Sequence, residues 1–180
     1  LAAITTVVLL GLSGFAARYF IHASAVQEAV LLAGDTGRPA DVDEALETLD
    51  SGESPGMRAR LIASMVLAGE RPVAEGTAAL GEVTDAAEEA AEKRKAEVYL
   101  ALADGDATRA WTLAAPIVAA GALGAESAHA KSLSAFAGGD VANALAEGAA
   151  AAAARPAPRY IAQHGLSLWL HGDSAGALER

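Results

Sequence analysis

The sequence predicts an all-α protein made of repeated helical hairpins. Helix-favouring residues, above all alanine and leucine, dominate a composition that is 53% hydrophobic and only 4% aromatic. A short glycine–acid turn also recurs along the chain, at spacings of 35, 36, 34 and 33 residues. Such a period is typical of an α-solenoid, in which helical hairpins stack along one axis. The five turn glycines are Gly34, Gly69, Gly105, Gly139 and Gly172.

The residue types at these turns suit the end of one helix and the start of the next. Glycine accepts the left-handed backbone conformation that ends a helix, and the following acid is suited to cap the next helix. An alanine follows five residues after most of the glycines. We expect it where the two helices of a hairpin cross most closely, because a larger side chain there would push them apart. These alanines are Ala74, Ala110, Ala144 and Ala177, with Ala45 in the first copy.

Residues 20–180 are therefore expected to form one repeat domain of about five hairpins. Its end lacks a final helix with a polar outer face, so we expect the domain to be incomplete at the C-terminus. The predicted helix pairs are Phe20–Ala33 with Asp41–Leu49, Gly56–Ala68 with Pro72–Val83, Asp85–Ala103 with Thr108–Ala119, Ala125–Ala137 with Val141–Ala154, and Arg159–His171 with a second helix that begins before Arg180.

Residues 1–19 differ in character from the repeats. Leu1–Ala17 carries no charge, and Arg18 and Tyr19 follow it, as residues at a membrane interface often do. A helix of this length spans roughly 26 Å, slightly less than a hydrocarbon core of ~30 Å. With a few further residues before Leu1 it is expected to be a transmembrane anchor. The alternatives are an apolar helix that packs onto the repeats and an uncleaved signal segment.

The repeat pattern resembles that of the tetratricopeptide repeat (TPR) family. The matching features are the glycine–acid turns, the alanines after them, Pro156 and the small residue Gly165. The early tryptophan of the family is absent, and the position eight residues before the glycine lacks its usual leucine. The resemblance covers residues 20–180 and implies a right-handed α-solenoid whose first helices line a concave groove. The position eight residues before the turn glycine, where the family usually has leucine, holds Glu97, Lys131 and His164 in three of the repeats.

In the TPR family, residues on the first helices of successive hairpins bind the partner. By this resemblance, the positions ten, six and three residues before each turn glycine face the groove. The spacing also suits a hydrophobic core, which is the alternative interpretation of these rows. The residues expected to bind a partner are Lys95, Tyr99, Leu102, His129, Leu133, Phe136, Leu166 and Trp169.

The sequence offers little support for catalysis. It has no cysteine, no glycine-rich phosphate loop and no zinc-protease helix. The triplet Asp35–Gly37 lies on a predicted turn rather than in the β-hairpin that an aspartic protease requires. His164 and His171 lack a third metal ligand. We therefore expect no enzyme activity, no cofactor and no metal.

Charge and the apolar start direct the functional hypothesis. The net charge of −10, without a Lys/Arg cluster, argues against binding to nucleic acid. We expect a membrane-anchored bacterial scaffold or accessory subunit that binds other proteins, with its repeat domain in the periplasm or, as the alternative, in the cytoplasm. Two alternatives remain open: a localising or regulatory segment of a larger enzyme, and a soluble TPR oligomer whose first helix is buried between protomers.

Overall fold

The computed structural model describes residues 22–49, 54–84, 86, 89–117 and 124–179, and all regular secondary structure in these residues is helical. The prediction of an all-α chain is confirmed for this part of the protein. The helices are one over residues 22–36, then α2 (Pro39–Thr48), α3 (Pro55–Leu67), α4 (Val73–Gly81), α5 (Ala90–Ala103), α6 (Ala107–Ala114), α7 (Gly124–Ala137), α8 (Val141–Ala154), α9 (Pro158–Leu170) and α10 (Ser174–Leu178).

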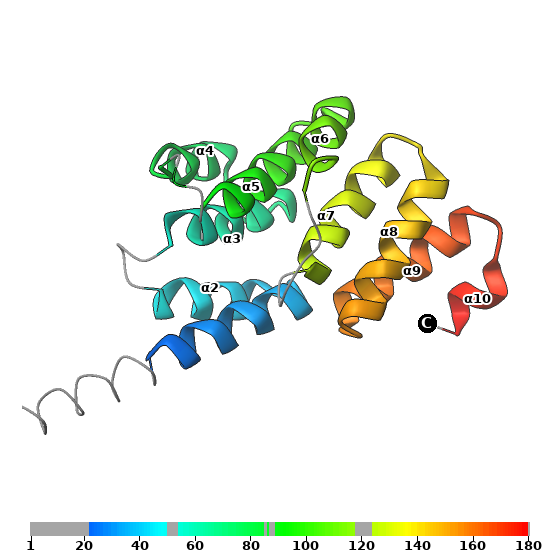
Figure 1. Cartoon of the computed structure of the whole chain (residues 1–180), viewed down its shortest axis with the longest axis horizontal. Coiled ribbons are helices and arrows are strands. Elements are labelled where there is room, and N and C mark those ends of the chain that lie inside the picture. The colour runs from blue at the N-terminus through cyan, green and yellow to red at the C-terminus, as the bar shows by residue number, and fades with distance from the viewer. Residues whose placement is uncertain (1–21, 50–53, 85, 87–88, 118–123, 180) are drawn as a thin grey trace, which may run out of the picture.

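The helices pack as hairpins that follow one another along the chain (Figure 1). Helix α3 packs on α4, α5 on α6, α7 on α8, and α9 on α10. The first helices of these hairpins also contact one another in the order α3, α5, α7 and α9. These four hairpins correspond to the second to the fifth of the five that the sequence predicts.

The left-handed turn glycines are confirmed at four of the five predicted turns. Gly69, Gly105, Gly139 and Gly172 have φ values of 80°, 75°, 77° and 92°. The prediction for Gly34 is wrong, because the first helix continues past it and Gly37 makes the turn instead, with φ of 62°. Gly34 has a packing role: a Cβ there would lie 3.2 Å from Glu126 Oε2 and 3.3 Å from the Tyr160 hydroxyl.

The acid after the glycine caps the second helix in the last three hairpins. The carboxylates of Asp106, Asp140 and Asp173 accept hydrogen bonds from the backbone N–H groups of Arg109, Asn143 and Gly176, at 2.9–3.1 Å. Glu70 has no such role, because Pro72 is the N-cap of α4 and the cap has no side-chain hydrogen bond. The acid after the turn glycine thus caps the second helix, as predicted, where that helix begins two residues after the glycine.

The predicted small residue at the helix crossing is confirmed at Ala110 and Ala144, which are buried, and is wrong at Ala74, which is exposed. Helix α4 begins four residues after its turn glycine rather than two, so the buried position moves from Ala74 to Gly76. A Cβ on Gly76 would lie 2.6 Å from a methyl group of Leu100. The requirement for a small residue is kept, but at a different residue.

Replacing Gly105 by alanine tests the turn conformation. No atom lies within 4 Å of a Cβ built at Gly105, so the cost comes from the left-handed backbone alone. We expect Gly105→Ala to lower the free energy of unfolding by about 1 kcal/mol in urea denaturation. Gly81→Ala is the matched control, since its Cβ is equally free and its φ is not left-handed. That control is expected to be neutral or slightly stabilising, and equal losses in both variants would contradict the assignment.

Apolar packing is continuous in the first half of the chain and smaller in the second. One buried cluster extends from Val30 and Ala33 through α2–α6 to Ala130 on α7. A second, smaller cluster joins α7, α8 and α9 and consists of Ala125, Ala128, Ala151, Ala157 and Tyr160.

The predicted anchor over residues 1–19 lies outside the described residues. Within the described ranges, no helix combines the length and the apolar character that crossing a bilayer requires.

Candidate functional site

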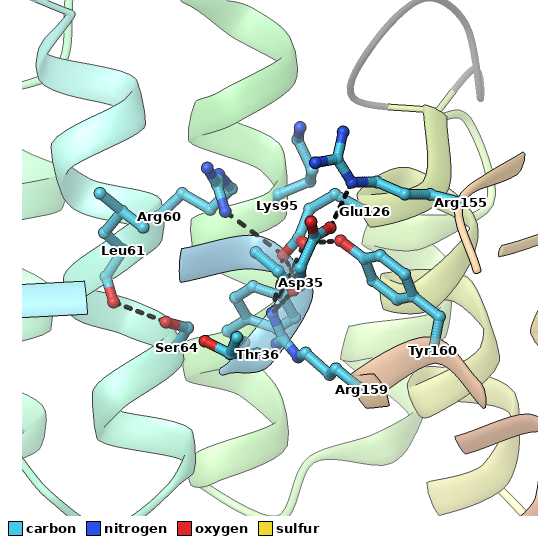
Figure 2. A network of polar contacts seen from close by, with 12 residues as sticks. Asp35, Thr36, Arg60, Leu61, Ser64, Lys95, Glu126, Arg155, Arg159 and Tyr160 are labelled. Carbon is cyan, nitrogen blue, oxygen red and sulfur yellow. Dashed lines mark hydrogen bonds and ion pairs between the residues drawn. The ribbon is translucent and has the colours of Figure 1, made fainter. Parts of the chain in front are cut away.

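A buried carboxylate, Glu126, lies at the centre of a polar network between the first helices of the hairpins (Figure 2). It comes from the first turn of α7 and its side chain is only 2% exposed. Its Oε1 accepts a hydrogen bond from the Tyr99 hydroxyl of α5, and its Oε2 accepts one from the Tyr160 hydroxyl of α9 at 2.9 Å. Arg60 Nη1 of α3 lies 3.3 Å from Oε1. One side chain thus connects all four first helices.

A second buried carboxylate extends the network toward α3 and α5. Arg60 Nε donates to Glu92 Oε2 at 2.6 Å, and Lys95 Nζ pairs with the other Glu92 oxygen. The side chains of Arg60 and Lys95 are each 1% exposed. Neither cation has direct access to solvent, so these pairs exclude water rather than present charge to it.

The network also reaches the first described helix, far away in the sequence. Arg159 Nη1 at the start of α9 donates to the backbone carbonyl of Gly34 at 3.2 Å and lies 3.4 Å from Glu126 Oε1. Beside it, Arg155 forms an ion pair with Asp35. The guanidinium of Arg159 also lies 5.8 Å from the centroid of the Tyr99 ring. The start of α9 is therefore held against the end of the first helix.

The electrostatics of the network follow from burial and pairing. Burial alone would raise the pKa of Glu126, but the Arg159 and Arg60 guanidinium groups hold it well below its usual range. Burial and the neighbouring Glu126 carboxylate raise the pKa values of Tyr99 and Tyr160. Both tyrosines therefore remain protonated and donate to a carboxylate that stays ionised.

His129, one turn after Glu126, is buried beside the same groups. Its ring meets the Tyr160 ring edge-on, with centroids 5.3 Å apart. Burial, together with the smaller effect of Arg159, lowers the pKa of His129 to about 3, and Glu126 partly opposes the shift. His129 is therefore neutral at physiological pH.

The eight predicted groove residues fall into three groups in the structure. Lys95, Tyr99 and His129 are buried within or beside the polar network. Leu102, Leu133 and Phe136 are half-buried. Only Leu166 and Trp169 on α9 are exposed, at 42% and 59%. Partner binding by the eight residues stays a prediction, and these two are the members that a partner can reach directly.

Leu166 and Trp169 belong to a larger apolar surface, which we call the α9 face. It consists of Leu166, Trp169 and Leu170 on α9. Leu170 is 45% exposed. Exposed large apolar side chains that gather in this way are typical of a contact surface.

The repeat spacing identifies the positions on earlier first helices that correspond to the α9 face. Tyr99, six residues before its turn glycine, contacts the next first helix at Glu126. His129, ten residues before its own glycine, contacts the next first helix at Tyr160. The equivalent positions on α9 are Leu166 and Ala162, and both are exposed. On α9, the positions that contact the next first helix in the earlier hairpins are therefore exposed.

The prediction from sequence missed the charged row at the centre of the site. Glu92, Glu126 and Arg159 each lie thirteen residues before a turn glycine, and the same position in the second hairpin is Gly56. This regular spacing was available in the sequence. It signals a polar row on an otherwise apolar helix face.

The described residues contain no group of three or more His, Asp or Glu side chains that could hold a metal ion. They define the class of the protein as an all-α protein of helices packed in hairpins. Neither a family model, nor a curated protein, nor a solved structure matches the chain. The TPR resemblance therefore rests on the turn residues and their spacing.

Proposed function

We propose that this chain is a non-catalytic helical-repeat module that binds proteins, and that the α9 face is its docking surface. The observation that carries the proposal is the exposure of Leu166 and Trp169. These side chains occupy rows that are buried or half-buried on α5 and α7. A helix placed on the α9 face would take the position that α7 has on α5 and that α9 has on α7.

The chemistry of the face supports a protein partner. Tryptophan and leucine side chains lose unfavourable contact with water when a partner covers them, and tryptophan is enriched among the residues that dominate interface energy. A partner that fits is an amphipathic helix whose apolar side contacts α9.

The buried polar network supports a structural role rather than catalysis. Its carboxylates are already paired with arginine, lysine and tyrosine inside the protein, and its cations are covered. A reactive group needs both an approach path and an unsatisfied demand for a proton or an electron pair. Because these side chains are buried, the Glu126 network offers a substrate no approach path.

The finer architecture and location are part of the same proposal. The regular turn spacing supports a right-handed solenoid of the TPR type. The uncharged segment before Arg18 supports a membrane anchor over residues 1–19, with the repeats serving an accessory or scaffolding role in a membrane complex, in the periplasm.

Affinity purification in mild detergent tests the docking surface. The tagged chain is expressed together with a second copy that carries a different tag, and bound proteins are identified by mass spectrometry. We expect Leu166→Ala/Trp169→Ala to lose at least one specific partner at least roughly tenfold, because each truncation removes an interface anchor. Leu32→Ala/Val73→Ala is the matched control, since both side chains are about equally exposed elsewhere at 41% and 42%.

The control variant should keep that partner, and both variants should keep the helical circular dichroism of the wild-type chain. An identical set of bound proteins for the α9 variant and the control would contradict the α9 face as the docking surface.

A further inference from the structure

The C-terminal end of the first described helix is held by two arginines that lie far away in the sequence (Figure 2). Arg159 Nη1 donates to the backbone carbonyl of Gly34 at 3.2 Å, and Arg155 forms an ion pair with Asp35. The last carbonyl groups of a helix lack partners within the helix, and positive charge is favoured beside them. The two arginines therefore recognise a helix end and the carboxylate next to it.

The same contact also requires small residues in the bound segment. A Cβ on Gly34 would lie 3.2 Å from Glu126 Oε2 and 3.3 Å from the Tyr160 hydroxyl. A Cβ on Gly37 would lie 3.1 Å from Cδ of Arg159. Glu126 and Tyr160 are buried, so they have little room to move away from a larger residue. The segment and its surroundings thus fit each other in shape as well as in charge.

An open cavity of about 410 Å³ reaches the edge of this contact. Asp35 and Arg155 line it, and their side chains are 17% and 35% exposed, whereas Glu126 at the centre is 2% exposed. A partner can therefore reach the Asp35–Arg155 pair before it reaches the rest of the contact. The other lining residues all belong to the first helix and are Ser24, Gln27, Glu28, Leu31 and Leu32.

We infer that this contact is a binding site for the end of a helix, and that the chain closes it with its own residues 34–37. The partner that fits is a protein helix that ends in a small residue followed by an aspartate. It competes with the attached segment, whose effective concentration is in the millimolar range for a short connection. The site is separate from the α9 face, so its test does not depend on the proposed docking function. We call it the helix-end site, and it consists of Arg155, Arg159, Tyr160 and Glu126.

Fluorescence anisotropy of a labelled peptide measures whether the site can be opened and refilled. The peptide comprises residues 22–49 of this chain and is titrated with the purified full chain in one mild detergent. Asp35→Arg in the full chain sets two like charges against each other at Arg155, so the attached segment should leave a site that is itself unchanged. We expect this variant to bind the peptide at least roughly tenfold more tightly than the wild-type chain does. Asp43→Arg is the matched control, because Asp43 also pairs with an arginine, Arg71 at 2.7 Å, but outside the site.

A charge exchange separates opening of the site from unfolding. Arg155→Glu added to Asp35→Arg again sets opposite charges against each other, so this double variant should close the site and reject the peptide. A peptide that itself carries Asp35→Arg should not bind the opened chain. All of the chains should keep the helical circular dichroism of the wild type.

Three results would overturn the inference. The first is equal affinity of the Asp35→Arg chain and the Asp43→Arg control for the peptide. The second is equal binding of the wild-type and the substituted peptide to the opened chain. The third is loss of helical structure in the Asp35→Arg chain, because residues 34–37 would then be part of the core and not a replaceable occupant.

Discussion

Replacing Glu126 by glutamine is expected to lower the free energy of unfolding by about 3–5 kcal/mol, the range found when one partner of a buried ion pair is removed. Glutamine keeps the size of the side chain but removes its charge. Arg159 then faces an amide that does not compensate its charge, and Arg60 keeps only its ion pair with Glu92. The two tyrosine hydroxyls that donate to Glu126 lose an ionised acceptor as well. Urea denaturation followed by circular dichroism measures the loss.

Glu147→Gln is the matched control for this experiment. Glu147 pairs with Lys131 at 3.8 Å, and the two side chains are 28% and 17% exposed. Pairs that reach solvent contribute little, so the control is expected to cost no more than ~1 kcal/mol. A similar cost for both variants would mean that Glu126 is hydrated and does not hold the hairpins together.

The Glu126 network changes how the hairpins depend on one another. In an ideal solenoid each repeat contacts only its neighbours, so stability is a sum of local terms. Here Arg159 reaches the carbonyl of Gly34, which is 125 residues away in the sequence. Glu126 also connects α3 and α5 to α9 directly. The described hairpins are therefore expected to unfold as one cooperative unit.

The hairpins could be predicted from sequence because their signals are local. A left-handed backbone, a capping carboxylate and a small residue at a crossing each depend on a few neighbouring residues, and Gly139, Asp140 and Ala144 supply all three. The prediction failed where the local geometry shifts. Helix α4, which has Pro72 as its N-cap, begins two residues further from its turn glycine than the later second helices do. The small residue at the crossing therefore moves to Gly76.

The polar network could not be predicted with the same ease, because its partners come from different hairpins. Periodicity places Glu92, Glu126 and Arg159 in equivalent positions, but it does not show that Arg60 of another row completes the pairing. It also does not show that Gly34 leaves room for Glu126 and Tyr160. Similarly, the apolar rows do not separate the buried Tyr99 from the exposed Trp169, since that difference depends on the next helix.

Acidification is expected to destabilise the wild-type chain through His129 before the carboxylates titrate. The pKa of His129 is about 3 in the folded protein, against ~6.5 in an unfolded chain. Protons therefore bind more tightly to the unfolded state. The contribution of His129 is fully present above pH ~6.5 and is lost as the pH falls toward 3. Between pH 6.5 and 4.5 the loss is on the order of 2–3 kcal/mol, at about 1.4 kcal/mol per pH unit.

His129→Phe isolates this effect, because phenylalanine keeps an aromatic edge against Tyr160 and cannot be protonated. Urea denaturation at several pH values should show a falling free energy of unfolding for the wild-type chain and a flatter profile for the variant. The other three histidines are common to both proteins, so their contributions cancel in the difference. Glu126 faces the same site, and its lowered pKa adds its own loss only as the pH falls below ~4.3, the value of a free glutamate. Parallel profiles above pH 4.5 would therefore show that His129 is not held neutral, whereas profiles that diverge only below that value would assign the acid sensitivity to Glu126.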